Sequence, residues 1–231
     1  MDAVRGQTNS MGKDMMQITI REPGSAITHF IGLVLAVLFA MPLLAKAGMS
    51  GDIRLVEGMM VFMGSMILLY SASTVYHSVV VDAKTLRVFQ KMDHMMIFVL
   101  IAGSYTPICL NVIGGAYGMA FLALVWGIAA AGMLLKAVWI TCPKWFSSLI
   151  YIGMGWICVF LFGRLLPLLS AQAFFWLFLG GIIYTAGGVI YALKLPIFNS
   201  RHRNFGSHEV FHLFVMGGSI CHYIFMYYYV A

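Results

Sequence analysis

Long apolar runs alternate with short polar segments along the chain after residue 24. A helix needs about 20 apolar residues to cross the hydrocarbon core of a bilayer. Spans are expected at about 26–47, 54–80, 93–112, 116–139, 146–167, 172–194 and 207–230. Residues 1–24 are predicted to form a polar N-terminal tail, and 25–231 a single membrane domain. The pattern therefore predicts an all-α, polytopic bundle of seven transmembrane helices, with a kink at Pro107 in the third.

The composition supports a membrane protein. The chain of 231 residues is 61% hydrophobic and only 10% charged, whereas a soluble domain carries about 25% charged residues. A soluble core of this size could not bury so much apolar surface, but lipid solvates it directly. The net charge of +6 comes from Lys and Arg scattered between apolar runs, without a basic stripe or a nucleic-acid-binding motif. Membrane lipids are therefore the expected partners, and nucleic acid is not.

The distribution of positive charge predicts an orientation. With seven spans, the N-terminus and the second, fourth and sixth loops lie on one side of the membrane. That side holds Arg5, Lys13, Arg21, Lys84, Arg87, Lys91, Lys136, Lys144, Lys194, Arg201 and Arg203. The other side holds only Lys46, Arg54 and Arg164. Because cytoplasmic loops carry the excess of Lys and Arg, the N-terminus is predicted to be cytoplasmic and the C-terminus outside.

Ionisable residues within spans are costly, so each indicates a functional site. His208 and His212 begin the seventh span at a spacing of four residues, which puts both imidazoles on one helical face within reach of one ion. His77 lies near the inner end of the second span, and Asp93 opens the third. The charge distribution, which did not use these residues, puts all four at the cytoplasmic end. We therefore expect them to lie close together.

Three histidine nitrogens with an open fourth position are typical of catalytic zinc. Asp93 would then orient or deprotonate a bound water. Ser73 lies one turn before His77 on the same face, where it could donate a hydrogen bond to that water or to a substrate oxygen. The alternative is that the histidines hydrogen-bond between helices without a metal.

The remaining polar residues give weaker signals. Glu209 points about 100° away from His208 and is expected at a helix interface rather than on the metal. His29, at the inner end of the first span, either joins the site or caps it. His94 is expected to face elsewhere on its helix. His222, 14 residues after His208, lies on nearly the same face about 20 Å deeper, either lining a cavity or making a structural hydrogen bond.

Several short motifs occur in a characteristic order. They are Glu22-x-x-Ser25-x-x-Thr28-His29-x-x-Gly32, Ser73-Thr74-Val75-Tyr76-His77, Lys91-Met92-Asp93, Ala102-Gly103-Ser104-Tyr105-Thr106-Pro107 and His208-x-x-x-His212 with His222 downstream. In these motifs the sequence resembles the hemolysin III family. This family is the bacterial branch of the progestin and adiponectin receptor superfamily, which is related to the alkaline ceramidases. The resemblance covers nearly the whole chain after the polar tail.

The resemblance implies a seven-helix protein of the bacterial cell membrane with a cytoplasmic N-terminus. It implies zinc held by three histidines, an aspartate that holds the zinc-bound water, and a serine beside it: His77, His208, His212, Asp93 and Ser73. Accessory candidates are Glu22, His29 and His222. In the receptors and ceramidases such a site is associated with hydrolysis of ceramide-type amides. Bacterial relatives carry the hemolysin name and are linked to membrane-lipid homeostasis.

These residues are compatible with three functions. The first is a zinc-dependent hydrolase of a lipid amide or ester, with substrate delivered laterally from the bilayer into a cavity lined by aromatic and Met side chains. The second is a cytolytic protein, although seven largely apolar spans offer no amphipathic pore-lining series. The third is a sensor or receptor in which zinc is structural and no chemistry occurs. A proton-coupled transporter is a further alternative, but no inverted repeat is evident.

Overall fold

The computed structural model describes residues 19–193 and 206–231. Its elements are α1 (Pro23–Met49), α2 (Ile53–Ser78), α3 (Ala83–Pro107), the π-helix η1 (Ile108–Ile113), α4 (Gly115–Val138), α5 (Lys144–Trp156), the 3-10 helix η2 (Ile157–Leu161), α6 (Phe162–Leu165), α7 (Ala171–Leu193), α8 (Ser207–Phe225) and the π-helix η3 (Met226–Val230). No strand occurs in these two stretches. Most of the predicted tail and nearly all of the sixth loop, with Lys194 and His202, lie outside the described residues.

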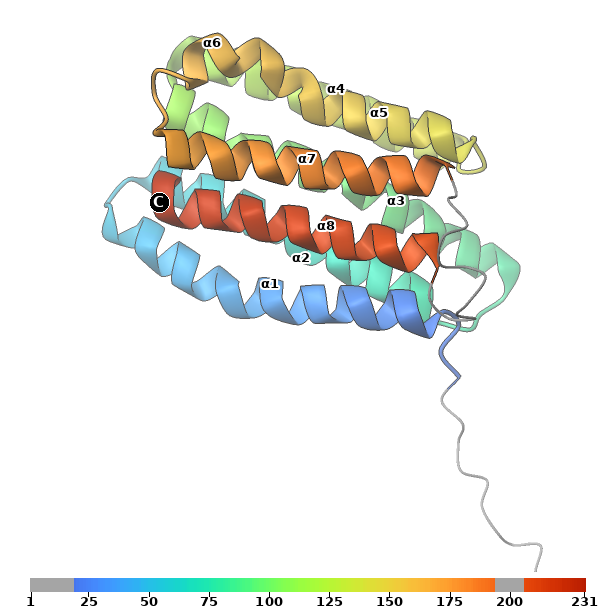
Figure 1. Cartoon of the computed structure of the whole chain (residues 1–231). Helices are drawn as coiled ribbons and strands as arrows, with labels where there is room; N and C mark the ends of the chain where they lie inside the picture. The colour runs from blue at the N-terminus through green and yellow to red at the C-terminus, as the bar shows by residue number, and fades with distance from the viewer. Residues whose placement is uncertain (1–18, 194–205) are drawn as a thin grey trace, which may run out of the picture.

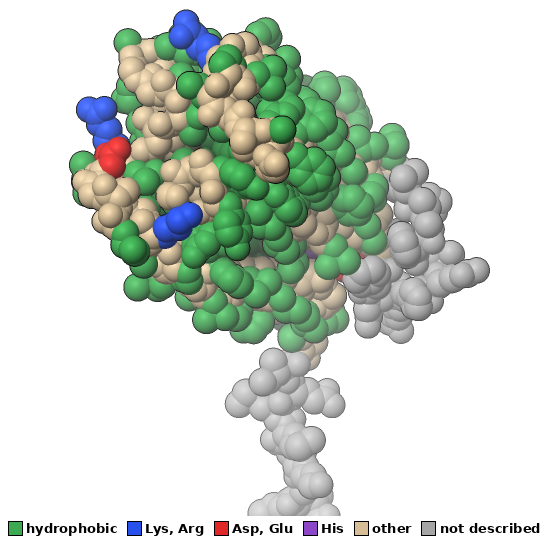
Figure 2. Space-filling view, turned by 60° about the vertical axis from the view of Figure 1, so that its left-hand side comes forward, with side chains coloured by type: hydrophobic (Ala, Val, Ile, Leu, Met, Phe, Trp, Pro, Cys, Tyr) green, Lys and Arg blue, Asp and Glu red, His purple; other side chains and the backbone are tan. Residues whose placement is uncertain are grey.

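Seven helical segments in the described part are long and apolar enough to cross a membrane, with bounds Pro23–Met49, Ile53–Ser78, Ala83–Ile113, Gly115–Val138, Lys144–Leu165, Ala171–Leu193 and Ser207–Val230. This confirms the prediction of an all-α seven-span protein. The surface also suits a membrane protein, since hydrophobic side chains dominate the face seen in Figure 2 and charged side chains are few there. The side on which each terminus lies stays a prediction from the charge distribution.

The helices form an antiparallel bundle (Figure 1). Neighbouring pairs include α1 with α2, α2 with α3, α7 with α8, and α1 with α8. Consequently the first described residues and the C-terminus lie at opposite ends of the bundle. Helices α1, α3, α5 and α8 begin at the end of the bundle that holds the first described residues. Helices α2, α4 and α7 finish at that same end. We call it the histidine end, because His77, His208 and His212 lie in its helix termini.

The third helix begins ten residues before the predicted start of its span. Its first turns, residues 83–92, are interrupted by Lys84, Arg87 and Lys91, so a hydropathy pattern does not include them. The carboxylate of Asp82 sets the start by accepting from the backbone N–H groups of Lys84, at 2.9 Å, and Thr85, at 3.1 Å. Asp93 therefore lies well inside α3 and does not open it, which corrects the sequence prediction.

Three spans depart from regular α-helix, and the seventh does so only at its end, in the π-helix η3. After Pro107 the third span continues as the π-helix η1, consistent with the missing N–H of proline. The fifth span breaks into α5, η2 and α6. The Tyr105 hydroxyl of α3 lies at this break, where it donates to the Gly155 carbonyl at 2.6 Å and accepts from the Cys158 N–H at 2.9 Å. One side chain thus satisfies backbone groups that a regular helix would pair internally.

Candidate metal centre

The candidate residues come from helices that meet at the histidine end. His77 lies in the last turn of α2, and His208 and His212 lie in the first turns of α8. Asp93 comes from α3 and His29 from the second turn of α1. His29, His77 and His212 are each at most 4% exposed, and Asp93 is 9% exposed. The structure thus brings together all the predicted ligands, although they are up to 135 positions apart in the sequence.

Three imidazoles form a group that could hold one ion. One ring nitrogen from each of His77, His208 and His212 lies within 4.8 Å of the others. The Nε2 atoms of His77 and His208 are 3.3 Å apart. Two nitrogens bound to one tetrahedral zinc at 2.0–2.1 Å are separated by roughly the same distance, about 3.3 Å. The donor type, the spacing and the burial therefore fit a tetrahedral metal with nitrogen ligands.

Two of the rings are oriented through their other nitrogen. Nδ1 of His77 contacts Oε2 of Glu22. Nδ1 of His212 lies 3.2 Å from the Ser25 carbonyl and 3.2 Å from the Thr28 hydroxyl. In both rings these contacts leave Nε2 available as a ligand. Hydrogen bonds of this kind, from a ligating histidine to a carboxylate or a carbonyl, set the tautomer and the direction of the ring.

The segment before α1 is held against the end of α2. The backbone N–H of Glu22 donates to the His77 carbonyl at 2.9 Å. Arg21 donates to the Tyr76 carbonyl at 2.7 Å and pairs with the Glu22 carboxylate at 2.9 Å. The hydrogen bond from His77, supported by the charge of Arg21, holds the pKa of the Glu22 carboxyl below its usual value. Glu22 is therefore an ionised partner that orients His77.

Asp93 and its neighbour occupy one side of the centre. Oδ2 of Asp93 lies 3.3 Å from Nδ1 of His94, which also lies 2.9 Å from the Gln90 carbonyl. Both residues line the internal cavity. The expectation that His94 faces elsewhere is therefore wrong. The χ angles of a histidine can turn its ring back along the helix toward an adjacent side chain, so the 100° separation of adjacent Cβ atoms did not exclude this contact.

Several buried polar atoms at the centre have no hydrogen-bond partner among the described residues. They are the Ser73 hydroxyl, Nδ1 of His208 and both ring nitrogens of His29. His29 stacks on His212 with ring centroids 3.6 Å apart, so it joins the cluster without being one of the three convergent ligands. An unpartnered buried polar atom costs about 1–3 kcal/mol. The unsatisfied Ser73 and His29 suit a site that binds a water or the oxygen of a substrate.

Ser25 and Glu209 connect α1 to α8 beside the three histidines. The Ser25 hydroxyl donates to Oε1 of Glu209 at 2.7 Å, and Oε2 of Glu209 accepts from the Gly206 N–H at 2.7 Å. Glu209 is thus an interface residue, as its angle from His208 predicted, and it also caps the start of α8. Arg21 and Thr28 also contact residues of the site, which was not predicted from the sequence. Thr28 belongs to the first motif, whereas no spacing rule indicated Arg21.

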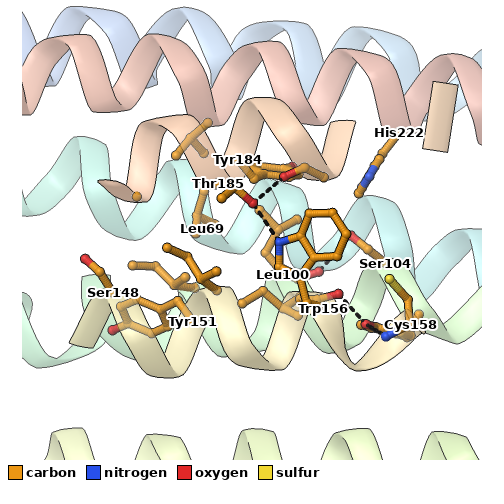
Figure 3. A pocket seen from close by; sticks show the side chains of 18 of the residues that line it. Leu69, Leu100, Ser104, Ser148, Tyr151, Trp156, Cys158, Tyr184, Thr185 and His222 are labelled. Carbon is orange, nitrogen blue, oxygen red and sulfur yellow. Dashed lines mark hydrogen bonds between the residues drawn. The ribbon is translucent and has the colours of Figure 1, made fainter. Parts of the chain in front are cut away.

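A cavity of about 180 Å³ extends from the histidines into the bundle. Aromatic and aliphatic side chains dominate its wall, among them Leu69, Leu100, Tyr151 and Trp156 (Figure 3). His222 faces this cavity, and its Nε2 lies 3.3 Å from the Leu177 carbonyl, so it both lines the cavity and contacts the backbone. No methionine lines the cavity in the described chain, which corrects the expectation of Met side chains there. Met63, Met66 and Met216 instead line an outer groove.

The sequence matches known proteins over most of its length. Residues 17–223 match the family described as Haemolysin-III related. A hemolysin-3 homolog of Bacillus subtilis (strain 168) is 36% identical over 202 residues, which cover 87% of this chain and 91% of the relative. Hemolysin-3 of Bacillus cereus is 35% identical over 205 residues, covering 89% and 90%. With seven apolar spans, the protein is a multi-pass protein of the bacterial cell membrane. The chain belongs to the hemolysin III family.

Proposed function

We propose that this protein is a zinc-dependent hydrolase of a lipid amide or ester that acts in membrane-lipid homeostasis. One observation carries the proposal: the three convergent imidazoles and a buried carboxylate lie at one end of a mostly apolar cavity within the membrane domain. An apolar cavity suits an acyl chain, and the polar end suits a carbonyl group. The substrate would enter from the bilayer.

The residues of the site would have separate roles in metal binding and proton transfer. His77, His208 and His212 would hold the metal, with Glu22 orienting the first of them. Zinc, when bound, would polarise the substrate carbonyl and activate a water for attack near neutral pH. Asp93 would take the proton of the attacking water and pass it to the leaving group.

Two further groups would act on the substrate itself. The Ser73 hydroxyl, unpartnered among the described residues, would donate a hydrogen bond to the carbonyl oxygen as negative charge develops on it. The aromatic wall would hold the acyl chain and exclude bulk water from the reacting bond.

The proposal is tested by incubating the purified, zinc-loaded protein with an N-acyl sphingoid lipid and, separately, with a phosphatidyl ester. Mass spectrometry would measure the free fatty acid released. Asp93→Asn serves as the matched control, because the amide keeps the shape of the side chain and cannot act as the base. Faster release by the wild type than by this variant supports hydrolysis. Equal release of fatty acid by the zinc-loaded wild type and the zinc-loaded Asp93→Asn variant contradicts hydrolysis and favours a sensor with structural zinc.

A lytic activity is the second candidate, and the name of the Bacillus cereus relative is what favours it. Dye release from liposomes distinguishes the two functions. Leakage caused equally by the wild type and by a metal-free His208→Ala variant would support lysis without chemistry. Leakage that requires both the metal and Asp93 would instead be a consequence of lipid hydrolysis.

A further inference from the structure

A second hollow lies on the outside of the bundle, between α1, α2 and α8. It is an open groove of about 590 Å³ with a mostly apolar wall that includes Ala36, Pro42, Met66, Met216, Ile220 and Tyr227. Small side chains on α1 make room for it. Its position on a face formed by three transmembrane helices exposes it to lipid, and α1 and α8 lie side by side there in Figure 1.

Three hydroxyl groups separate this groove from the inner cavity. The Tyr70 hydroxyl donates to the Ser219 hydroxyl at 2.8 Å, and the Tyr184 hydroxyl lies 2.9 Å from the same Ser219 oxygen. Tyr70 and Ser219 line the groove, whereas Tyr184 lines the inner cavity. Because this hydrogen-bonded layer closes the floor of the groove, a molecule in it would not contact the histidine cluster.

The groove has the length of one lipid leaflet. Along α1, which covers Pro23–Met49, its wall runs from Gly32 to Pro42. Ten residues of α-helix cover about 15 Å, which is half of the roughly 30 Å hydrocarbon core. The groove is therefore about as long along α1 as the hydrocarbon part of one leaflet is thick, which suits an extended acyl chain.

A cation lies at the interfacial end of the groove. Lys46, one turn beyond Pro42 on α1, donates to the Tyr227 carbonyl, and its Nζ lies 4.7 Å from the Tyr227 ring centroid and 5.9 Å from that of Tyr228. Both tyrosines line the groove. Lys46 makes no ion pair with any carboxylate in the described part of the chain. An ammonium group has three donors, so two remain for an anionic ligand.

From the charge at one end and the leaflet-long apolar wall, we infer that the α1–α8 groove binds an anionic phospholipid. One acyl chain lies along Ala36, Met66 and Ile220, and the phosphate accepts hydrogen bonds from Lys46. Tyr227 and Tyr228 lie at the depth of the headgroup, where tyrosines are enriched in membrane proteins. This lipid is a bound partner distinct from any substrate in the inner cavity, so the inference does not depend on the proposed hydrolysis.

Native mass spectrometry of the purified protein, titrated with phosphatidylglycerol in detergent, tests the headgroup contact. The wild type is expected to retain one phosphatidylglycerol and to bind phosphatidylcholine more weakly. Lys46→Gln should weaken phosphatidylglycerol binding about tenfold, the effect of losing one charge-assisted hydrogen bond. Arg54→Gln, which removes an exposed charge at the same end of the bundle, should leave it unchanged. Lys46→Gln that binds like the wild type, or an equal loss in Arg54→Gln, overturns the inference.

A second pair of variants tests the acyl chain. Ile220→Trp should fill the groove and displace the lipid, since Ile220 is 50% exposed and lines it. Leu213→Trp is the control, two turns earlier on the same helix face, 45% exposed and outside the groove. Both variants should keep the melting temperature of the wild type, because neither replaced side chain is buried. Lipid retention that is equal in the two Trp variants contradicts the inference.

Discussion

The Nε2 atoms of His77 and His208 lie 3.3 Å apart although 131 positions separate the two residues in the chain. Because Nδ1 of His77 contacts the Glu22 carboxylate and carries the proton, Nε2 of a neutral His77 has a lone pair directed toward His208, which can accept from Nε2–H of His208 or, in the other His208 tautomer, face a second lone pair. A metal ion satisfies both lone pairs, and His212 supplies a third. A hydrogen bond between His77 and His208 would leave the third nitrogen, from His212, unused, whereas a common ligand engages all three.

Replacing a ligand should remove the metal. We expect the purified wild type to contain close to one zinc per chain and His77→Ala and His208→Ala to contain almost none, measured by inductively coupled plasma mass spectrometry. His222→Gln is the matched control, because His222 lines the same cavity at a distance from the cluster. A wild type without zinc, or zinc retained in both alanine variants, would show that the histidines serve another purpose.

Asp93→Asn should separate binding of the metal from chemistry. The variant keeps the size of the side chain and all three histidines, so its zinc content should match the wild type. Loss of the general base should lower lipid turnover by about 100-fold or more. Asp82→Asn, at the exposed cap of α3, should retain full turnover. Loss of zinc in Asp93→Asn would instead identify the aspartate as a ligand.

Glu22→Gln should change the pH dependence of stability. The pKa of Glu22 is lowered in the folded protein because its carboxylate accepts a hydrogen bond from His77. A lowered folded pKa means that the contribution is complete above the unfolded pKa and is lost as the pH falls through the folded value. The melting temperature of the metal-free wild type should therefore fall toward pH 4 more steeply than that of Glu22→Gln.

The exposed Glu57→Gln provides the control for this comparison and should follow the wild-type pH curve. The same Glu22 variant should also bind zinc about 10–100-fold more weakly, the usual effect of losing an outer-shell carboxylate on a ligating histidine. If the pH curves of the wild type and Glu22→Gln coincide, Glu22 does not stabilise the folded protein through His77.

Tyr105→Phe should destabilise the fifth span. Removing the hydroxyl leaves the Gly155 carbonyl and the Cys158 N–H without their partner at the helix break, which should cost about 1–3 kcal/mol. Chemical unfolding in detergent would measure this difference. Tyr117→Phe is the control, because its ring can still pack under Arg164 and it lies near the surface. Equal stability of the two variants would mean that water or lipid replaces the Tyr105 hydroxyl without cost.

The hydrophobic pattern was sufficient to predict the number of spans, since each helix must satisfy its backbone within itself in lipid. The alternation of spans then put His77, Asp93, His208 and His212 at one end of the bundle. Hydropathy could not predict the start of α3, because the Asp82 cap and not apolar content sets it. It also could not predict the break of the fifth span after α5, which Tyr105 of another helix stabilises.

The sequence by itself determined the class of protein, its family and the identity of the candidate ligands, because span length and residue type are local properties. Only the tertiary structure decided which nitrogen of each ring faces the others, that His94 turns toward Asp93, and that methionines line the outer groove and not the inner cavity. These features depend on rotamers and on the rotation of each helix about its axis. Both are set by packing against neighbouring helices, which no pattern along a single helix specifies.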